Sequence, residues 1–279
     1  MADPTAAERP RIELLADADH PGGVMLVMDA VRQSYVDLTD PTYLDFEYIQ
    51  FFASALEVAA PDRPDRQLAV THVGGGGLTM PRYLAVTRPG SPQIVLEPDE
   101  ELTEIVRAQL PLPRNHRIRI RPQAGRPGVA ALREASADLV ILDAYDDGRV
   151  PADLTTTEFL ADVARVLRPD GLLLANLVDE PGLRYVRRVV AGVLGCFADV
   201  ALISSHDVLK GRRFGNVVLA ASDRPLDVDA LRREVLRQPF PAGVRDRSQL
   251  VQLLAGAKPF TDVESAGSPE PNGQGWRIR

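Results

Sequence analysis

The sequence has one cysteine, Cys196, and four histidines that lie far apart along its 279 residues. A single cysteine excludes a disulfide framework and a cysteine-based metal cluster. The wide separation of the histidines does not fit the short ligand spacings of a zinc site. We therefore expect no metal cofactor.

Long apolar runs are also missing. No stretch approaches the roughly 18 apolar residues that a membrane-spanning helix needs. The N-terminal segment from Met1 to Pro10 lacks the apolar core of a signal peptide. We expect a cytoplasmic protein with no membrane partner.

Positive charge is scarce, because 32 lysine and arginine residues stand against 39 aspartate and glutamate residues, for a net charge of −7. An acidic chain, here with a sequence pI of about 5.2, is disfavoured as a general binder of nucleic acid or anionic membranes. The same charge is compatible with a small cationic substrate. The hydrophobic share of 45% is ordinary for a soluble globular chain.

Glycine, in contrast, is concentrated in one place. The apolar run 68–73 ends in four glycines, 74–77, and a helix-compatible segment begins near residue 80, which predicts strand, tight turn and helix. Glycines let the backbone pass close to a ligand, and the free N–H groups of the next helix then face that ligand. A second apolar strand, 93–97, ends in Glu97, where an acid can bind a ribose diol. The pattern predicts a nucleoside pocket at the carboxyl edge of a parallel sheet.

The glycine spacing also bears on the kind of nucleotide. A dinucleotide fingerprint needs glycine at its first, third and sixth positions, but the sixth position is Thr79 counted from Gly74, or Met80 counted from Gly75. The missing glycine disfavours NAD and favours a pocket of the S-adenosylmethionine type. A glycine-rich turn without any ligand stays open as the alternative.

Strand and helix patterns alternate through the rest of the chain, which predicts an α/β fold with a parallel sheet of seven strands. The expected strands are 68–73, 93–97, 117–121, 138–143, 171–177, 198–203 and 214–221. We expect the last strand to be antiparallel and to form a hairpin with the sixth at the sheet edge. The expected domains are an N-terminal β-strand element plus helix (1–66), a Rossmann-like nucleoside-binding domain (67–222), C-terminal helices (223–262) and a disordered tail (263–279) that is poor in apolar residues.

An acidic loop follows the fourth strand and carries Asp143, Tyr145, Asp146 and Asp147. Carboxylates this close repel one another unless a cation or solvent lies among them. A cationic amine is therefore a fitting guest. A solvated acidic loop is the alternative interpretation, because aspartate and glycine are common in loops.

From residue 23 to residue 222 the sequence resembles the polyamine aminopropyltransferases, the family of spermidine synthase. The resemblance rests on these residues and segments: Gln33, Glu47, Gly74–Gly76, Arg82, Glu97 with Asp99, Asp143 with Asp146, 157–159 and 166–171. It implies a Rossmann-like sheet of the S-adenosylmethionine-methyltransferase type with a small N-terminal β-hairpin domain. It also implies a homodimer and decarboxylated S-adenosylmethionine as co-substrate.

The resemblance, together with the acidic loop, assigns the site residues. Asp143 and Asp146 are the expected catalytic residues. The expected nucleoside-binding residues are Gln33, Gly74, Gly75, Gly76, Gly77, Glu97, Ala124 and Gly125. The expected amine-binding residues are Glu47, Tyr145 and Asp147.

The sequence departs from the family at several of these positions. Gly77 stands where the family has an aspartate that binds the ammonium of the decarboxylated donor, and Ala124 where it has an acidic or amide residue beside adenine. Phe46 replaces a histidine, and 211–216 lacks the aromatic pocket residues of the family. An aspartate at position 77 would repel the α-carboxylate of S-adenosylmethionine, so Gly77 favours that undecarboxylated co-substrate or a nucleoside product.

Three functions stay open from the sequence. The first is aminopropyl transfer to a polyamine acceptor, in which Asp143 accepts the proton of the attacking amine. The second is methyl transfer from S-adenosylmethionine. The third is a catalytically inactive homologue that binds a nucleoside, because fold alone does not fix activity.

Overall fold

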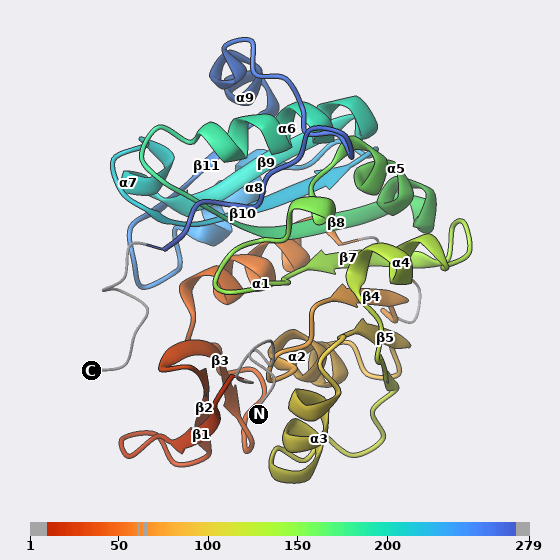
Figure 1. Cartoon of the computed structure of the whole chain (residues 1–279), viewed down its shortest axis with the longest axis vertical. Coiled ribbons are helices and arrows are strands. Elements are labelled where there is room, and N and C mark those ends of the chain that lie inside the picture. The colour runs from red at the N-terminus through yellow and green to blue at the C-terminus, as the bar shows by residue number, and fades with distance from the viewer. Residues whose placement is uncertain (1–9, 61, 64–65, 272–279) are drawn as a thin grey trace, which may run out of the picture.

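The computed structural model describes residues 10–60, 62–63 and 66–271. Its N-terminal part is a three-stranded antiparallel sheet of β1 (Ile12–Ala16), β2 (Gly23–Met28) and β3 (Val31–Asp37), in that spatial order. Figure 1 shows this small sheet at the lower left, apart from the main sheet. The predicted N-terminal β element is present.

The main sheet has eight strands in the order β11-β9-β10-β8-β7-β4-β5-β6. Their bounds are β4 (Val70–Val73), β5 (Gln93–Leu96), β6 (Ile118–Arg121), β7 (Ala137–Leu142), β8 (Leu167–Asp179), β9 (Asp199–Ser205), β10 (Gly215–Ser222) and β11 (Ala242–Arg245). Strands β6, β5, β4, β7 and β8 run parallel, whereas β10 is antiparallel to both β8 and β9.

Helices cover both faces of this sheet. Their bounds are α1 (Glu47–Ala59), α2 (Thr79–Thr87), α3 (Glu100–Gln109), α4 (Gly125–Ala130), α5 (Thr157–Val166), α6 (Arg184–Cys196), α7 (His206–Leu209), α8 (Val228–Val235) and α9 (Arg247–Leu254), with a 3-10 turn at Ala152–Leu154. None of the helices in the described part of the chain is long and apolar enough to cross a membrane.

The side chains of β7 point alternately to the two faces of the sheet, and each face forms its own hydrophobic core with the helices that cover it. Val140 and Leu142 pack into a core under α5 and α6, whereas Leu139 and Ile141 pack into the opposite core with α1 and α8. All four side chains are almost fully buried, as expected for a parallel strand covered on both faces. In Figure 1, α5 and α6 lie above the sheet and α1 lies below it. The predicted α/β fold class is confirmed.

The prediction for the sheet edge was wrong in one respect. All seven predicted strands are present, and the antiparallel direction of β10 is confirmed. The predicted hairpin of the sixth and seventh strands is also present as the antiparallel pair β9 and β10. However, this hairpin is not at the sheet edge, because an eighth strand, β11, pairs with the outer side of β9. Strand β11 has only four residues and contains Gly243, so it has no apolar alternation that a sequence pattern can detect.

The C-terminal segment also differs from expectation. Residues 263–271 fall in the predicted disordered tail, yet Ser268 is fully buried. Its hydroxyl accepts a hydrogen bond of 2.9 Å from the Val150 amide, and its own amide donates to the Val150 carbonyl at 3.2 Å. The segment is held by polar contacts rather than by apolar burial, which is why its composition did not reveal it. Residues 272–279 lie outside the described residues, and the proposed domain limits at 66, 222 and 262 stay predictions.

Candidate functional site

The glycine turn joins β4 to α2 and needs glycine at its first position. Gly74 has a φ of +97°, and a Cβ atom there would lie 2.2 Å from the backbone oxygen of Asp143. Gly76 also has a positive φ, of +47°. L-residues with a side chain rarely adopt such backbone conformations. The turn can therefore pass close under β7 only because these positions lack a side chain.

Glu97 lies beside this turn, at the carboxyl end of β5. Its Oε2 atom accepts a hydrogen bond of 2.8 Å from the Gly75 amide, and its Oε1 atom accepts one of 2.9 Å from the Asp99 amide. The two predicted elements of the nucleoside pocket, the turn and the acid, are therefore in direct contact. An acid that follows the second strand of such a sheet is placed where it can bind a ribose diol.

A cavity of about 1150 Å³ opens at the carboxyl ends of β4, β5 and β7. The predicted site residues that line it are Gln33, Gly74, Gly75, Gly76, Glu97, Ala124, Gly125, Asp143, Tyr145, Asp146 and Asp147. Two other predicted residues, Gly77 and Glu47, are not part of this lining. Most of the predicted nucleoside-binding and amine-binding residues thus share one open space.

Gly77 is kept out of the cavity by the N-terminal sheet. Its amide donates a hydrogen bond of 3.0 Å to the Ser34 hydroxyl on β3. A Cβ atom at position 77 would lie 2.9 Å from Ser34 Cβ and 3.0 Å from Val36 Cγ2. A larger side chain at position 77 would therefore collide with β3.

Glu47 lies at the start of α1 and is exposed. Although the residue as a whole is exposed, partial desolvation by the surrounding chain raises the pKa of its carboxyl, and the nearby Arg213 guanidinium opposes that shift. Asp45, two residues earlier, is in the cavity lining. The family pattern pointed to Glu47, but the chain turns into α1 so that the neighbouring acid is the one that faces the cavity.

Asp143, at the end of β7, is held by two side chains from distant parts of the chain. Its Oδ1 atom accepts a hydrogen bond of 2.9 Å from Asn176 Nδ2 on β8, and its Oδ2 atom accepts one of 3.2 Å from the Tyr48 hydroxyl on α1. Asn216 Nδ2 donates in turn to Asn176 Oδ1 at 2.9 Å. This network fixes the orientation of the carboxylate.

Burial raises the pKa of Asp143 to about 6, against the opposing effect of the hydrogen bonds from Asn176 and Tyr48. A carboxylate with such a pKa is ionised at neutral pH and still basic enough to take up a proton. Sequence reasoning identified Asp143 but missed Tyr48, Asn176 and Asn216. Tyr48 was visible only as part of the apolar face of α1, and the two asparagines fall inside strands that look purely structural.

The acidic loop after β7 is a tight turn. Asp146 and Arg149 exchange two backbone hydrogen bonds of 2.8 and 2.9 Å. Between them, Asp147 and Gly148 have φ values of +48° and +72°, which is the pattern of a type I′ turn. The turn presents the exposed Asp146 and Asp147 side chains at the open side of the cavity.

The C-terminal segment, residues 263–271, packs against this turn. Arg149 Nε donates a hydrogen bond of 2.7 Å to the Ser268 carbonyl, and the same guanidinium lies 3.5 Å from a Glu270 carboxylate oxygen. A Cβ atom at Gly148 would lie 3.1 Å from Pro271 Cγ. Gly267, Glu270 and Pro271 belong to the cavity lining, so the segment forms part of the wall that sequence analysis left out.

The cavity is strongly acidic. Nine carboxylate residues line it: Asp29, Asp45, Glu97, Asp99, Asp143, Asp146, Asp147, Asp153 and Glu270. Within the described chain, Arg149 is the single arginine or lysine in this lining, and its guanidinium faces Ser268 and Glu270. Such an environment attracts cations.

Gly125 and Arg82 shape the structure around the glycine turn. Gly125 begins α4, and a Cβ atom there would lie 2.4 Å from Val73 Cγ1, so glycine lets α4 approach β4. Arg82 is buried below the turn and donates to the carbonyl oxygens of Gly77 at 3.2 Å, Pro111 at 2.7 Å and Leu110 at 2.5 Å. Arg82 therefore supports the turn from beneath.

No group of three or more histidine, cysteine, aspartate or glutamate residues that could hold a metal ion occurs in residues 10–60, 62–63 and 66–271.

Comparisons with known proteins agree with this geometry. No protein-family model matches the sequence. The crystal structure of a probable spermidine synthase from Corynebacterium glutamicum shares 34% identity and a TM-score of 0.84, over 91% of this chain and 94% of that chain. A spermidine synthase in complex with the transition-state analogue AdoDATO shares 16% identity and a TM-score of 0.56, over 89% of this chain and 82% of that chain, and at this identity the likeness shows the fold alone.

Among curated proteins, the polyamine aminopropyltransferase of Vibrio vulnificus is 29% identical over 116 residues. The match covers 41% of this chain and 38% of that protein. This chain thus spans well under two thirds of that relative's length.

Proposed function

The chain belongs to the spermidine synthase-like family as a divergent member, and on that premise we propose that it transfers an aminopropyl group from decarboxylated S-adenosylmethionine to a small polyamine acceptor. The observation that carries the proposal is the Asp143 carboxylate. It lies beside the glycine turn, at the start of the acidic loop, and its pKa is raised to about 6.

The nucleoside of the donor would lie against the glycine turn. Glu97 would bind the ribose hydroxyls. The hydrogen bond from the Gly75 amide to its Oε2 atom would hold the carboxylate in position. Ala124 and Gly125 would line the base. The position of each residue in the cavity supports these roles. A neighbour of the same fold is described in complex with AdoDATO, which supports a donor of this chemical type.

The acceptor amine would enter over the acidic loop. Asp143 would hold the reacting nitrogen and accept its proton, while Asp146, Asp147 and Asp45 would attract the remaining ammonium groups. The nitrogen lone pair attacks the carbon beside the sulfonium, and the carbon–sulfur electron pair returns to sulfur. The products are an alkylated amine and neutral methylthioadenosine, with the released proton on Asp143. Alignment of the two substrates would supply much of the rate.

A specific observation favours a second candidate, methyl transfer from S-adenosylmethionine. The position of the family's ammonium-binding aspartate is Gly77, which Ser34 and Val36 cover. The start of α2 therefore offers no carboxylate to the amine of the decarboxylated donor, and none to repel the α-carboxylate of S-adenosylmethionine. The two candidates give different nucleoside products.

The test is to identify the nucleoside product by chromatography. The purified protein is incubated with a polyamine and either sulfonium donor. Methylthioadenosine formed from the decarboxylated donor supports the first proposal, and S-adenosylhomocysteine supports the second. Nucleoside binding without either product contradicts both and leaves a non-catalytic homologue. Asp143→Asn should abolish turnover and keep methylthioadenosine binding, whereas Glu104→Gln, an exposed carboxylate on α3, should change neither.

We also propose a homodimer, as the family resemblance implies. Sedimentation velocity at several protein concentrations would measure the mass in solution. A monomer at every concentration would contradict this proposal without affecting the assignment of the cavity.

A further inference from the structure

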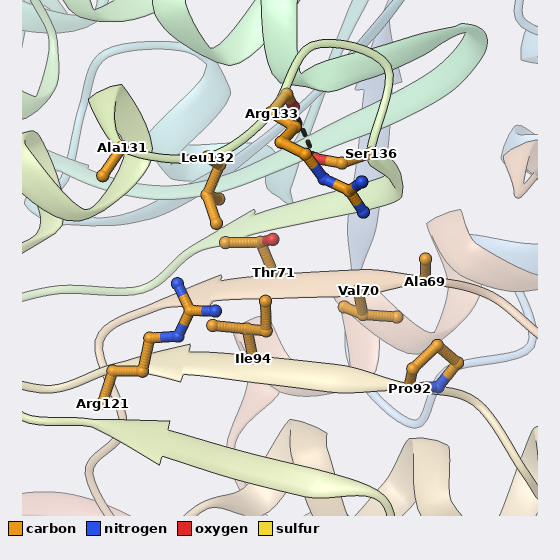
Figure 2. Close-up of a pocket in the computed structure, with 10 residues that line it drawn as sticks. All are labelled: Ala69, Val70, Thr71, Pro92, Ile94, Arg121, Ala131, Leu132, Arg133 and Ser136. Carbon is orange, nitrogen blue, oxygen red and sulfur yellow. Dashed lines mark hydrogen bonds between the residues drawn. The ribbon is translucent and has the colours of Figure 1, made fainter.

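A second, smaller hollow of about 260 Å³ lies on the face of the sheet beside α4, mostly near the amino ends of β4, β5 and β7. Figure 2 shows its two walls, the strands on one side and the loop after α4 on the other. The proposed catalytic residues lie beyond the opposite ends of these strands. The two hollows therefore share no lining residue.

The charge of this hollow is opposite to that of the large cavity. Its lining contains Arg121 and Arg133 and no aspartate or glutamate. In Figure 2 the two guanidinium groups extend toward the hollow from opposite walls. Among the residues that the structure describes, neither side chain has a hydrogen-bond or ion-pair partner.

A third polar group lies between them. Thr71, on β4, is only 3% exposed and lines the hollow with a hydroxyl that has no partner among the described residues. Within the described chain, this hydroxyl is not among the fully buried side-chain atoms that lack a hydrogen-bond partner. It therefore opens onto the hollow and is free to donate a hydrogen bond to a ligand that enters it.

The wall that carries Arg133 is held in place. The Ser136 hydroxyl donates a hydrogen bond of 2.6 Å to the Arg133 carbonyl, drawn as the dashed line in Figure 2. The Ser136 amide bonds to the Val166 carbonyl at 2.9 Å, and Arg165 donates to the Leu132 carbonyl at 2.8 Å. A fixed wall lowers the entropic cost of binding a ligand.

We propose that this hollow is a second ligand site, for a small oxyanion with two or more negative charges. Arg121 and Arg133 would bind its charged oxygens from the two walls, and the Thr71 hydroxyl would donate to it from the floor. Guanidinium groups match the geometry of both phosphate and carboxylate. The shared chemistry is thus a multivalent oxyanion, carried by a phosphate compound or by a dicarboxylate.

The test is a thermal-shift and calorimetric titration of the full chain with inorganic pyrophosphate and, separately, with succinate. Sodium chloride at matched ionic strength is the control for general screening. Saturable binding by either probe is expected, since a ligand of the native state raises its stability. A response to pyrophosphate alone assigns the site to phosphates, and a response to succinate alone assigns it to carboxylates.

Variants then locate the binding. Arg121→Gln and Arg133→Gln should each weaken the affinity about tenfold or more, because each removes charge-assisted hydrogen bonds. Thr71→Val, which keeps the side-chain shape, should weaken it severalfold. Arg119→Gln is the matched control, because Arg119 is exposed on the same strand, β6, and is absent from the lining.

Two outcomes would overturn the proposal: no saturable response to either probe, or equal affinity in wild type and in the Arg133→Gln variant. Arg133 is exposed on a loop, so this variant should fold even if a substitution at the more buried Arg121 does not. Neither outcome involves turnover in the acidic cavity, so the result is independent of the proposed transferase function.

Discussion

At the scale of single residues, the burial that raises the pKa of Asp143, and so suits it to its proposed role as a base, also lowers the stability of the folded protein when the carboxyl is ionised. Its carboxyl has a pKa of about 6 in the folded chain, against 3.8 for an unperturbed aspartate. Between these pH values the folded state keeps a proton that the unfolded state has already released. Stability is therefore lost as the pH rises from about 4 through about 6. Full loss amounts to about 2–3 kcal/mol.

We therefore expect Asp143→Asn to stabilise the protein above pH 6, where the wild-type carboxylate is charged, and to have little effect near pH 4. The expected gain is a melting temperature several degrees higher at pH 7.5. Thermal melts of both proteins from pH 4 to pH 8 provide the measurement. A gain that does not change with pH would show that the substitution acts through packing and not through this charge.

Protonation of the same carboxyl should also determine how the catalytic rate falls at low pH. Protonated Asp143 cannot accept the proton of the attacking amine, so kcat/KM for the acceptor should fall at least about tenfold for each pH unit below about 6. The measurement is methylthioadenosine release at saturating donor and low acceptor concentration between pH 5 and pH 8. A flat kcat/KM across this range would rule out Asp143 as the base.

At the scale of elements, the contact between β3 and the glycine turn explains how this chain differs from its family. Restoring the family aspartate as Gly77→Asp should destabilise the protein by about 1–3 kcal/mol, because the new side chain collides with Ser34 and Val36. The measurement is denaturant unfolding.

Adding Ser34→Gly should recover part of that loss and strengthen binding of decarboxylated S-adenosylmethionine. The double variant Ser34→Gly with Gly77→Ala is the control, since it has the same relief of crowding and no carboxylate. Equal donor affinity in the two double variants would show that the charge at position 77 has no role.

Much of this arrangement could be predicted from the sequence because it depends on local patterns. Glycines followed by a helix, an acid after the next strand, and Asp143 after a buried strand each leave a short signature. Tyr48, Asn176 and Ser34 leave none, because their roles depend on contacts between segments 33 to 95 residues apart. Strand β11 and residues 263–271 were not predicted. A four-residue strand is too short to show alternating apolar residues, and the C-terminal segment is held by hydrogen bonds, which leave no periodic hydrophobic pattern in the sequence.

At the scale of the whole molecule, Gly267, Glu270 and Pro271 form part of the cavity wall beside the acidic turn, on the side where we propose that the acceptor enters. A chain ending at Glu264 would lose the contacts of Ser268 with Arg149 and Val150. Its acidic turn should loosen, and KM for the polyamine should rise roughly tenfold. Nucleoside affinity should not change, because Glu97 and the glycine turn lie elsewhere.

The matched control is a chain ending at Pro271, which keeps every contact described for the segment. Steady-state kinetics and methylthioadenosine titration of the two truncated chains give the comparison. An unchanged KM in the shorter chain would contradict a role for the segment in acceptor binding.

The hydroxyl of Ser34 has one more consequence, which concerns energetic linkage. The glycine turn, where we propose that the nucleoside binds, is hydrogen-bonded to an amino acid from a different sheet, 43 positions earlier in the chain. A ligand that stabilises the glycine turn in this conformation must, by thermodynamic reciprocity, also stabilise the contact between the turn and β3. Amide hydrogen exchange along β3 should therefore slow when methylthioadenosine binds, although most of that strand never touches it.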